Sequence, residues 1–231
     1  MNKEEIKSKI NKIVYYVLWV LPLLESLFLL QFLPEQIPAH YNAAGEVTRY
    51  GSRYETLIIP VFVIVFGAFM LLMANFVKKT EENGNRNNEK VMIIAGLSSL
   101  GVFNVMNIYF LYTGMKGVEN LNDVPVNLDK LMFSLLGLIM IVLGNLMPKC
   151  RKNHIIGVRT KWSLSSDYAW KKSQRFGGIT FIISGVLIIV GNAFLTESLA
   201  CFIYSMTILC IDTIISIIYS YVVYKKEKSS I

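Results

Sequence analysis

One polar segment stands apart from the rest of this chain, the stretch from Asn153 to Arg175. It reads NHIIGVRTKWSLSSDYAWKKSQR and gathers basic, aromatic and hydroxyl side chains in an otherwise strongly apolar sequence. Gly157 permits a tight bend, and Arg159 offers a planar fork of hydrogen-bond donors beside the hydroxyl group of Thr160. This chemistry suits binding and anchoring, because no nucleophile stands with a matching base in a known catalytic pattern.

The ordered pattern N-x-x-x-G-x-R-T-x-W, followed by W-x-x-x-x-R, defines the candidate site of this segment. Its residues are Asn153, Gly157, Arg159, Thr160, Trp162, Trp170 and Arg175. Each of them, taken alone, also fits a membrane interface, where Trp lies at headgroup level and basic side chains reach the phosphates. Ser165 or Ser166 is a good helix N-cap with Asp167 favourable in the first turn, so we expect a helix that runs on into the next apolar stretch.

A second candidate site lies in residues 34–56, the first polar connection. Its pattern P-x-x-I-P-x-H-x-N-x-x-G supplies four candidate residues, which are Pro38, His40, Asn42 and Gly45. The prolines bias their neighbours towards extended backbone, and Asn42 and Gly45 are turn formers. His40 is either a titrating functional group or a hydrogen-bonded turn residue; a metal site would need more ligands than one histidine.

Six apolar stretches are long enough to cross a membrane, which takes about 20 residues. They are Ile13–Leu33, Leu57–Val77, Val91–Thr113, Leu128–Met147, Phe176–Phe194 and Ser198–Tyr224. The chain is 54% hydrophobic and 17% charged, with a mean hydropathy of +0.48. This composition excludes a soluble domain of 231 residues. It predicts an all-α, polytopic protein of the cell membrane with six transmembrane helices.

The basic residues predict the orientation of these helices. Four of the 23 Lys and Arg residues lie on one side of the membrane, namely Arg49, Arg53, Lys116 and Lys130. The other 19 lie on the opposite side, which the positive-inside rule identifies as the cytoplasm. Both termini are therefore expected in the cytoplasm. The net charge of +7 mainly reflects this topology, so anionic lipids are expected partners and direct nucleic-acid binding is the weaker alternative.

The polar, Asn-rich segment 81–90 is a plausible boundary between two modules. Residues 1–80 would form a two-helix module with the external loop, and residues 91–231 a four-helix module with the cytoplasmic loop. The cysteines suggest no disulfide. They also suggest no metal site, because Cys150 has only His154 nearby as a second ligand. No cofactor is expected.

Two acids, Glu25 and Asp212, fall near the middle of predicted spans. Acids at this depth are costly and tend to mark pathways or relays. One interpretation is a satisfied hydrogen bond between helices, for which Asn104 or Asn107 would be polar neighbours. The other is an ion or proton path, which would make the chain a small-solute or ion-coupled transporter.

The cytoplasmic segment KNHIIGVRTKWSLSSDYAWKKSQRFGG, preceded by GNLMPK, resembles the signature of the SdpI family of bacterial membrane proteins. The external LPEQIPAHYNAAGEV is similar to the small N-terminal domain that often precedes it. The resemblance implies that the motif residues of both loops are functional. It also implies a non-enzymatic immunity protein that gives resistance to a secreted antimicrobial peptide toxin, and a receptor that recruits a winged-helix repressor to the membrane.

The charge of the cytoplasmic loop limits how such a repressor would dock. DNA-binding repressors usually present a basic face, which a loop of formal charge +7 would repel. Docking is therefore expected at Trp162, Leu164 or Tyr168, or on an acidic patch of the partner. A lipid-modifying enzyme is a further alternative, with His40 or His154 as a base, but neither histidine has an evident nucleophile or metal partner.

Overall fold

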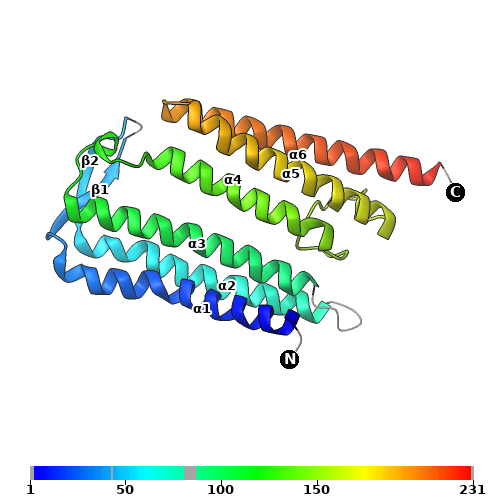
Figure 1. The fold of residues 1–231 in the computed structure, drawn as a ribbon, viewed down its shortest axis with the longest axis horizontal. Coiled ribbons are helices and arrows are strands. Elements are labelled where there is room, and N and C mark those ends of the chain that lie inside the picture. The colour runs from blue at the N-terminus through cyan, green and yellow to red at the C-terminus, as the bar shows by residue number, and fades with distance from the viewer. Residues whose placement is uncertain (1–2, 43, 81–86, 230–231) are drawn as a thin grey trace. The chain divides into compact units, whose positions relative to one another are not determined.

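The computed structural model of the protein describes residues 3–42, 44–80 and 87–229. These residues contain six long helices (Figure 1), which are α1 (Lys3–Leu29), α2 (Ile58–Thr80), α3 (Asn87–Lys116), α4 (Leu128–Leu146), α5 (Asp167–Phe194) and α6 (Ser198–Lys228). Each helix carries a stretch long and apolar enough to cross a membrane. Many Leu, Ile, Val and Phe side chains stay exposed along them, as lipid-facing surfaces require. The predicted multi-pass membrane protein is confirmed.

A β-hairpin between α1 and α2 adds to this helical architecture. Strands β1 (Gln36–Tyr41) and β2 (Val47–Ser52) pair antiparallel, with register shifts on either side of His40. The prolines of this segment predicted extended backbone, but not the pairing of two strands. An isolated two-stranded hairpin is marginally stable in water. This one is supported by Ile37, which is buried against Leu33 and Leu111.

The described residues pack as two compact units that do not follow chain order. One combines residues 1–72 with 96–132, and the other combines 73–95 with 133–231. This division differs from the predicted modules because α3 is one continuous helix whose later part packs with α1. Residues 81–86 of the proposed boundary lie outside the described part, so a linker there stays a prediction.

In the first unit, α3 compensates for a proline inside α1. Pro22 has no N–H group, so the carbonyl of Leu18 one turn earlier lacks its helical donor. The Nδ2 of Asn104 donates to this carbonyl over 2.9 Å. Further along, Asn107 donates to the carbonyl of Pro22 over 3.4 Å and accepts from the hydroxyl of Ser26 over 3.2 Å. These amides replace the water that a bilayer core cannot provide.

Helix α1 also contacts α2 in this unit, again with backbone carbonyls as acceptors. The Tyr15 hydroxyl donates to the carbonyl of Gly67 over 2.7 Å, and the Trp19 indole donates to that of Ile64 over 2.8 Å. A side chain at Gly67 would collide with the Trp19 ring. The glycine therefore lets the indole reach the backbone of α2.

In the second unit, α4 and α5 approach closely through two glycine pairs. A Cβ atom at Gly137 would lie 2.6 Å from the carbonyl oxygen of Gly185, and one at Gly185 would lie 2.5 Å from that of Gly137. Gly144 and Gly178 show the same reciprocal contact at 2.6 and 2.5 Å. The glycines are seven residues apart on both helices. Such small residues let membrane helices pack backbone to backbone.

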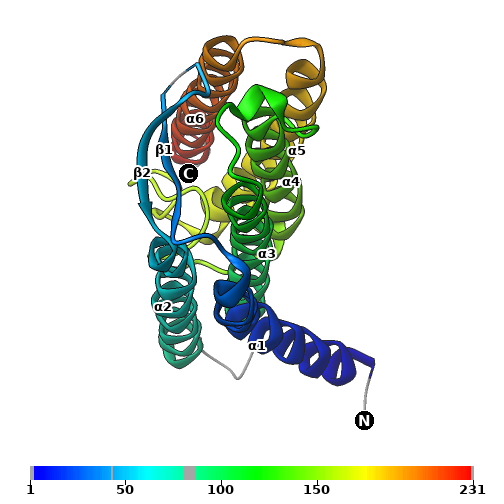
Figure 2. The same ribbon diagram turned by 90° about the vertical axis from the view of Figure 1, so that its left-hand side faces the viewer.

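Helices α5 and α6 form an antiparallel pair joined by a short connection (Figure 2). The side-chain hydrogen bonds that link them include those between Asn192 and Ser205 (2.9 Å), Ser184 and Asp212 (3.2 Å), and Thr180 and Ser216 (3.4 Å). Asp212 is buried within this polar seam, with 6% of its surface exposed. Its contact with Ser184 is an interhelical hydrogen bond, which agrees with one of the two interpretations predicted for this acid.

The suggestion that Asn104 or Asn107 pairs with a membrane acid is wrong. Both amides bond to backbone carbonyls of α1, and Asn107 also bonds to Ser26. Glu25 is half-buried, and its Oε2 atom has no hydrogen-bond partner within the part of the chain that the structure describes.

The role of Asn104 can be tested through Pro22. We expect Asn104→Leu to lower the free energy of unfolding by about 1–3 kcal/mol, because the Leu18 carbonyl is left without a donor. In the Pro22→Ala background the cost should be smaller, because position 22 regains an N–H group that bonds to Leu18. Unfolding in detergent micelles, followed by circular dichroism, measures both costs. Equal costs in the two backgrounds would contradict this account.

Candidate functional site

The segment between α4 and α5, residues 150–166, is a closed hydrogen-bonded structure that we term the motif loop. Trp170, in the first turns of α5, anchors its beginning. The indole is 2% exposed, donates to the carbonyl of Cys150 over 2.8 Å, and packs in a cluster with Val91 and Leu146. The sequence predicted Trp170 near the membrane interface, and the structure shows that its ring packs in the core of the second unit.

Asn153 forms the first turn of the motif loop. Its Oδ1 atom accepts from the backbone N–H groups of Ile155 and Ile156, both over 2.7 Å, and its Nδ2 group donates to the carbonyl of Arg151 over 2.7 Å. An Asn side chain that bonds to backbone two or three residues away is a typical turn former. Asn153 therefore fixes backbone geometry, and its amide is not free for a ligand.

Gly157 and Gln174 dock the middle of the motif loop onto α5. The fully buried amide of Gln174 accepts from the N–H of Val158 over 3.0 Å and donates to its carbonyl over 2.9 Å. Gly157 has a φ of +95°, which favours glycine. A Cβ atom there would also collide with the Gln174 amide. The glycine is thus required both by backbone conformation and by this contact.

Thr160 connects the motif loop to α6. Its hydroxyl lies 2.8 Å from that of Ser220 on α6 and accepts from the N–H of Ser163 over 3.0 Å. Ser163 is fully buried, and its hydroxyl donates to the carbonyl of Val158 over 2.8 Å. The motif threonine therefore belongs to a hydroxyl network that reaches from the loop into α6.

Two further contacts fasten the same region to α6. The Trp162 ring meets the Tyr221 ring edge to face at 5.0 Å between centroids. Ser166 caps α5, as predicted, by accepting from the N–H of Ala169 over 3.0 Å, and its hydroxyl donates to Glu227 over 2.6 Å. The carboxylate of Glu227 thereby sits near the positive end of the α5 dipole.

The two motif arginines stay at the surface. Arg159 is exposed and donates one N–H to the carbonyl of His154 over 2.7 Å. Arg175 is exposed as well, and forms no hydrogen bond or ion pair with any described residue. The structure thus brings Asn153, Gly157, Thr160, Trp162 and Trp170 into one fold, while Arg175 points away from it.

Sequence reasoning missed Gln174 and Ser163, both buried polar residues of this fold. Gln174 follows Trp170 by four residues, and residues four apart share one face of a helix. That spacing would have placed the amide beside the buried indole. Ser163 offered no comparable signal, because its partners lie in irregular backbone.

The external motif builds the turn of the hairpin. The Oδ1 atom of Asn42 accepts from the N–H groups of Ala44 and Glu46, both over 2.9 Å, and Gly45 has a φ of +84°. Pro38 is buried in β1 opposite Tyr50. The predicted turn role of Asn42 and Gly45 is confirmed by this geometry.

The tip of the hairpin is docked on residues 118–122, in the connection between α3 and α4. The N–H of Leu121 donates to the carbonyl of Gly45 over 2.8 Å, and the N–H of Val47 donates to that of Glu119 over 2.9 Å. The Tyr41 hydroxyl donates to the carbonyl of Val118 over 2.8 Å. Burial raises the pKa of Tyr41, so the phenol stays a neutral donor at physiological pH.

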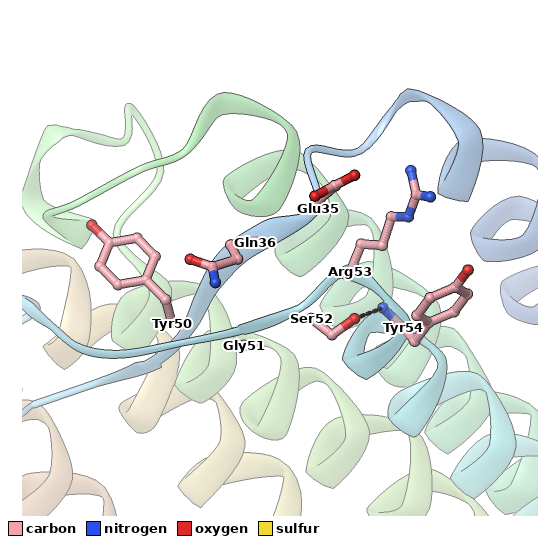
Figure 3. Close-up of a pocket in the computed structure, with 7 residues that line it drawn as sticks. All are labelled: Glu35, Gln36, Tyr50, Gly51, Ser52, Arg53 and Tyr54. Atoms are coloured by element: carbon pink, nitrogen blue, oxygen red, sulfur yellow. Dashed lines mark hydrogen bonds between the residues drawn. The ribbon is translucent and has the colours of Figure 1, made fainter.

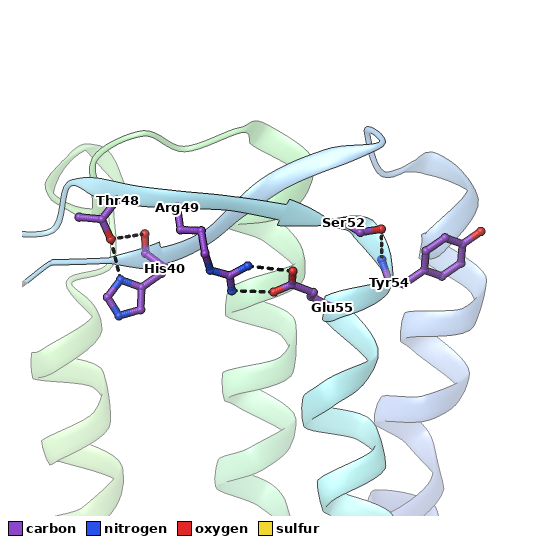
Figure 4. Close-up of polar contacts among 6 residues, drawn as sticks. All are labelled: His40, Thr48, Arg49, Ser52, Tyr54 and Glu55. Atoms are coloured by element: carbon purple, nitrogen blue, oxygen red, sulfur yellow. Dashed lines mark hydrogen bonds and ion pairs between the residues drawn. The ribbon is translucent and has the colours of Figure 1, made fainter.

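His40 is exposed on the hairpin, and its Nδ1 atom lies 2.6 Å from the hydroxyl of Thr48 (Figure 4). This contact supports the interpretation of His40 as a hydrogen-bonded residue of the hairpin. Across the same hairpin, Arg49 forms a two-pronged ion pair with Glu55 at 2.9 and 2.7 Å. In the described ranges, no group of three His, Cys, Asp or Glu residues is placed to hold a metal ion.

These features define a membrane protein whose described residues contain six long helices, a docked hairpin and a motif loop. Residues 149–220 match the SdpI/YfhL protein family, and residues 17–64 match a domain of unknown function, DUF1648. The family match covers the motif loop and most of α5 and α6, and the second match covers the hairpin. The resemblance to the SdpI family is thereby confirmed.

Two curated proteins are similar to this chain. Immunity protein SdpI of Bacillus subtilis is 26% identical over 220 residues, which make up 95% of this chain and 99% of that protein. An uncharacterized protein of Archaeoglobus fulgidus is 38% identical over 65 residues, or 28% of this chain and 33% of that protein. No solved structure matches the chain.

The docking of the motif loop on Gln174 can be tested by hydrogen exchange. We expect Gln174→Leu to raise the exchange rate of the amides in residues 153–164 about tenfold, because the Val158 N–H loses its partner and the Val158 carbonyl keeps only the Ser163 hydroxyl. Exchange is measured by mass spectrometry in detergent micelles. Arg175→Gln is the matched control, because this exposed neighbour forms no described bond. Unchanged exchange in Gln174→Leu would contradict the proposed docking.

Proposed function

We propose that this chain is an integral membrane immunity protein that gives resistance to a secreted antimicrobial peptide toxin. The observation that carries the proposal is the similarity to immunity protein SdpI, which covers 95% of this chain and 99% of that protein. The hairpin, the motif loop and all six helices therefore fall almost entirely within the shared length. A peptide toxin acts at or in the membrane, where this protein has its apolar helices and external loops.

The motif side chains are held in contacts within the protein, which supports a non-enzymatic role. Asn153 and Thr160 are held in hydrogen bonds to backbone or to other hydroxyl groups, and Trp170 is buried. These residues determine the shape of the loop. A shaped surface suits binding to another molecule better than bond-breaking chemistry, which needs a poised nucleophile or base.

We also propose a receptor function, in which the motif loop reports the state of the membrane helices to a cytoplasmic repressor. Its physical basis is the attachment of the loop to α6 through Ser220, Tyr221 and Glu227. These contacts span two turns of one helix. Any shift of α6 relative to α5 must therefore break them or carry the loop along.

The exposed surface near the motif loop limits where a repressor would dock. Of the three apolar residues expected there, Trp162 is half-buried against Tyr221, and Leu164 packs on the core cluster around Trp170. Tyr168 is 48% exposed, with the Lys172 ammonium 5.6 Å from its ring centroid. Tyr168 is therefore the anchor we favour. The basic residues around it are also placed to meet anionic lipids.

Immunity is tested by expressing the chain in cells killed by the peptide toxin against which immunity protein SdpI acts. We expect cells with the wild-type chain to survive. Thr160→Val should reduce survival, because it removes the hydroxyl contact with α6 while keeping the shape of the side chain. Thr207→Val on α6 is the control, since its hydroxyl bonds only to its own helix, at Ile203. Death of wild-type cells despite correct membrane insertion would overturn the proposal for this toxin.

Repressor recruitment is a separate measurement, made with a candidate winged-helix repressor fused to a fluorescent protein. We expect Tyr168→Ala and Trp162→Ala to reduce the membrane-bound fraction when toxin is present. The double substitution of Lys171 and Lys172 by Gln should leave it largely unchanged, because a basic repressor face is not attracted to these lysines. If the lysine substitutions reduced the membrane-bound fraction and the aromatic substitutions did not, the repressor would dock through charge and not through the aromatic surface.

A further inference from the structure

A hollow of about 490 Å³ lies at the open end of the hairpin, where the chain leaves α1 and enters α2. Figure 3 shows the seven residues that line it, which are Glu35, Gln36, Tyr50, Gly51, Ser52, Arg53 and Tyr54. All of them belong to the first compact unit. The motif residues of the external loop do not line it, so the hollow is separate from the hairpin turn described above.

Two opposite charges face this hollow without neutralising each other. The N–H of Arg53 donates to the carbonyl of Glu35 over 3.1 Å, so the two residues are neighbours across the hairpin. Their side chains nevertheless form no ion pair, and the Arg53 guanidinium bonds to the carbonyl of Leu33 over 3.4 Å. Nearby, Arg49 and Glu55 show that charges on this hairpin do pair where their geometry allows it.

Two tyrosines complete the hollow. Tyr50 and Tyr54 are 50% and 59% exposed, and Figure 3 shows their rings at opposite ends of the lining. The Tyr50 hydroxyl reaches Glu119 over 3.3 Å. The guanidinium of Arg53 lies 5.7 Å from the centroid of the Tyr54 ring, which helps to orient the cation.

The ends of the two neighbouring apolar spans indicate that the hollow faces the lipid headgroups. The first apolar span ends at Phe32, and the second begins at Arg53. Residues 33–52 therefore leave and re-enter the membrane at this place. Exposed tyrosines at such a position are typical of the interface between headgroups and hydrocarbon.

We propose that this hollow binds a zwitterionic group made of an ammonium and a phosphate, as in the headgroup of phosphatidylethanolamine. The Glu35 carboxylate receives the ammonium, and the free N–H groups of Arg53 receive the phosphate, for which the guanidinium fork is well shaped. The two protein charges sum to zero. A purely anionic headgroup would be repelled by Glu35, and a simple cation by Arg53, so the zwitterion is the ligand that satisfies both.

The test uses the full chain in nanodiscs that contain equal amounts of phosphatidylethanolamine and phosphatidylglycerol. The protein is extracted in mild detergent, and the lipids that remain bound are counted by mass spectrometry. We expect the wild type to retain phosphatidylethanolamine preferentially, and Glu35→Gln to reduce this preference about tenfold, which corresponds to about 1.4 kcal/mol. Glu46→Gln is the matched control, because this acid lies at the hairpin turn and does not line the hollow.

A second arm distinguishes a lipid from a free zwitterion, with soluble glycerophosphoethanolamine titrated against the detergent-solubilised protein. Binding of the soluble compound by the wild type but not by Glu35→Gln, without lipid preference, would support the same chemistry with a free ligand. Equal retention of both lipids by the wild type, together with no binding of the soluble compound, would overturn the proposal. Melting temperatures of Glu35→Gln and the wild type, measured without added ligand, separate lost binding from lost folding.

Discussion

The constraint on which this structure depends is that a lipid bilayer offers no water to backbone polar groups. Each irregularity in a spanning helix must therefore find a partner inside the protein. Pro22 leaves the Leu18 carbonyl without its helical donor, and Asn104 supplies one from another helix. Close packing also respects this constraint, because the glycines of α4 and α5 let the two helices meet backbone to backbone without polar side chains between them.

In the motif loop, irregular backbone beside the membrane also finds its hydrogen-bond partners within the protein. Side-chain amides and hydroxyls make the hydrogen bonds that backbone groups would make in a helix. Asn153 accepts from the N–H of Ile155, Gln174 accepts from the N–H of Val158, and Ser163 donates to the carbonyl of Val158. A motif of this kind encodes a shape and not a reaction. Substituting such a residue leaves a buried polar group unpaired, which costs more than the hydrogen bond itself contributed.

Much of this architecture could be predicted from local sequence signals. Apolar length predicts six spans, and the polar residues before α5 predict its cap at Ser166. The orientation that the uneven distribution of Lys and Arg indicates stays a prediction. Contacts between distant residues could not be predicted in this way. Asn104 bonds to Leu18 across 86 positions. A Trp beside a basic cluster indicates a position at the membrane interface, and only the tertiary structure shows that the Trp170 ring is buried in a core. The hairpin was missed because proline specifies extended backbone, but not which segment pairs with it.

The seam between α5 and α6 has energetic properties that suit a receptor. Its contacts include three hydrogen bonds of 2.9–3.4 Å between side chains, and such bonds between membrane helices contribute on average about 0.6 kcal/mol each. Their sum is a few kcal/mol at most, which lies in the range that a ligand can overcome by binding one arrangement of helices better than another. The glycine contacts of α4 with α5 are different, because backbone-to-backbone packing leaves no room for adjustment. If the helices move, α6 is therefore the helix that can shift while α4 and α5 stay together. The motif loop is attached to both α5 and α6, so such a shift acts directly on the loop.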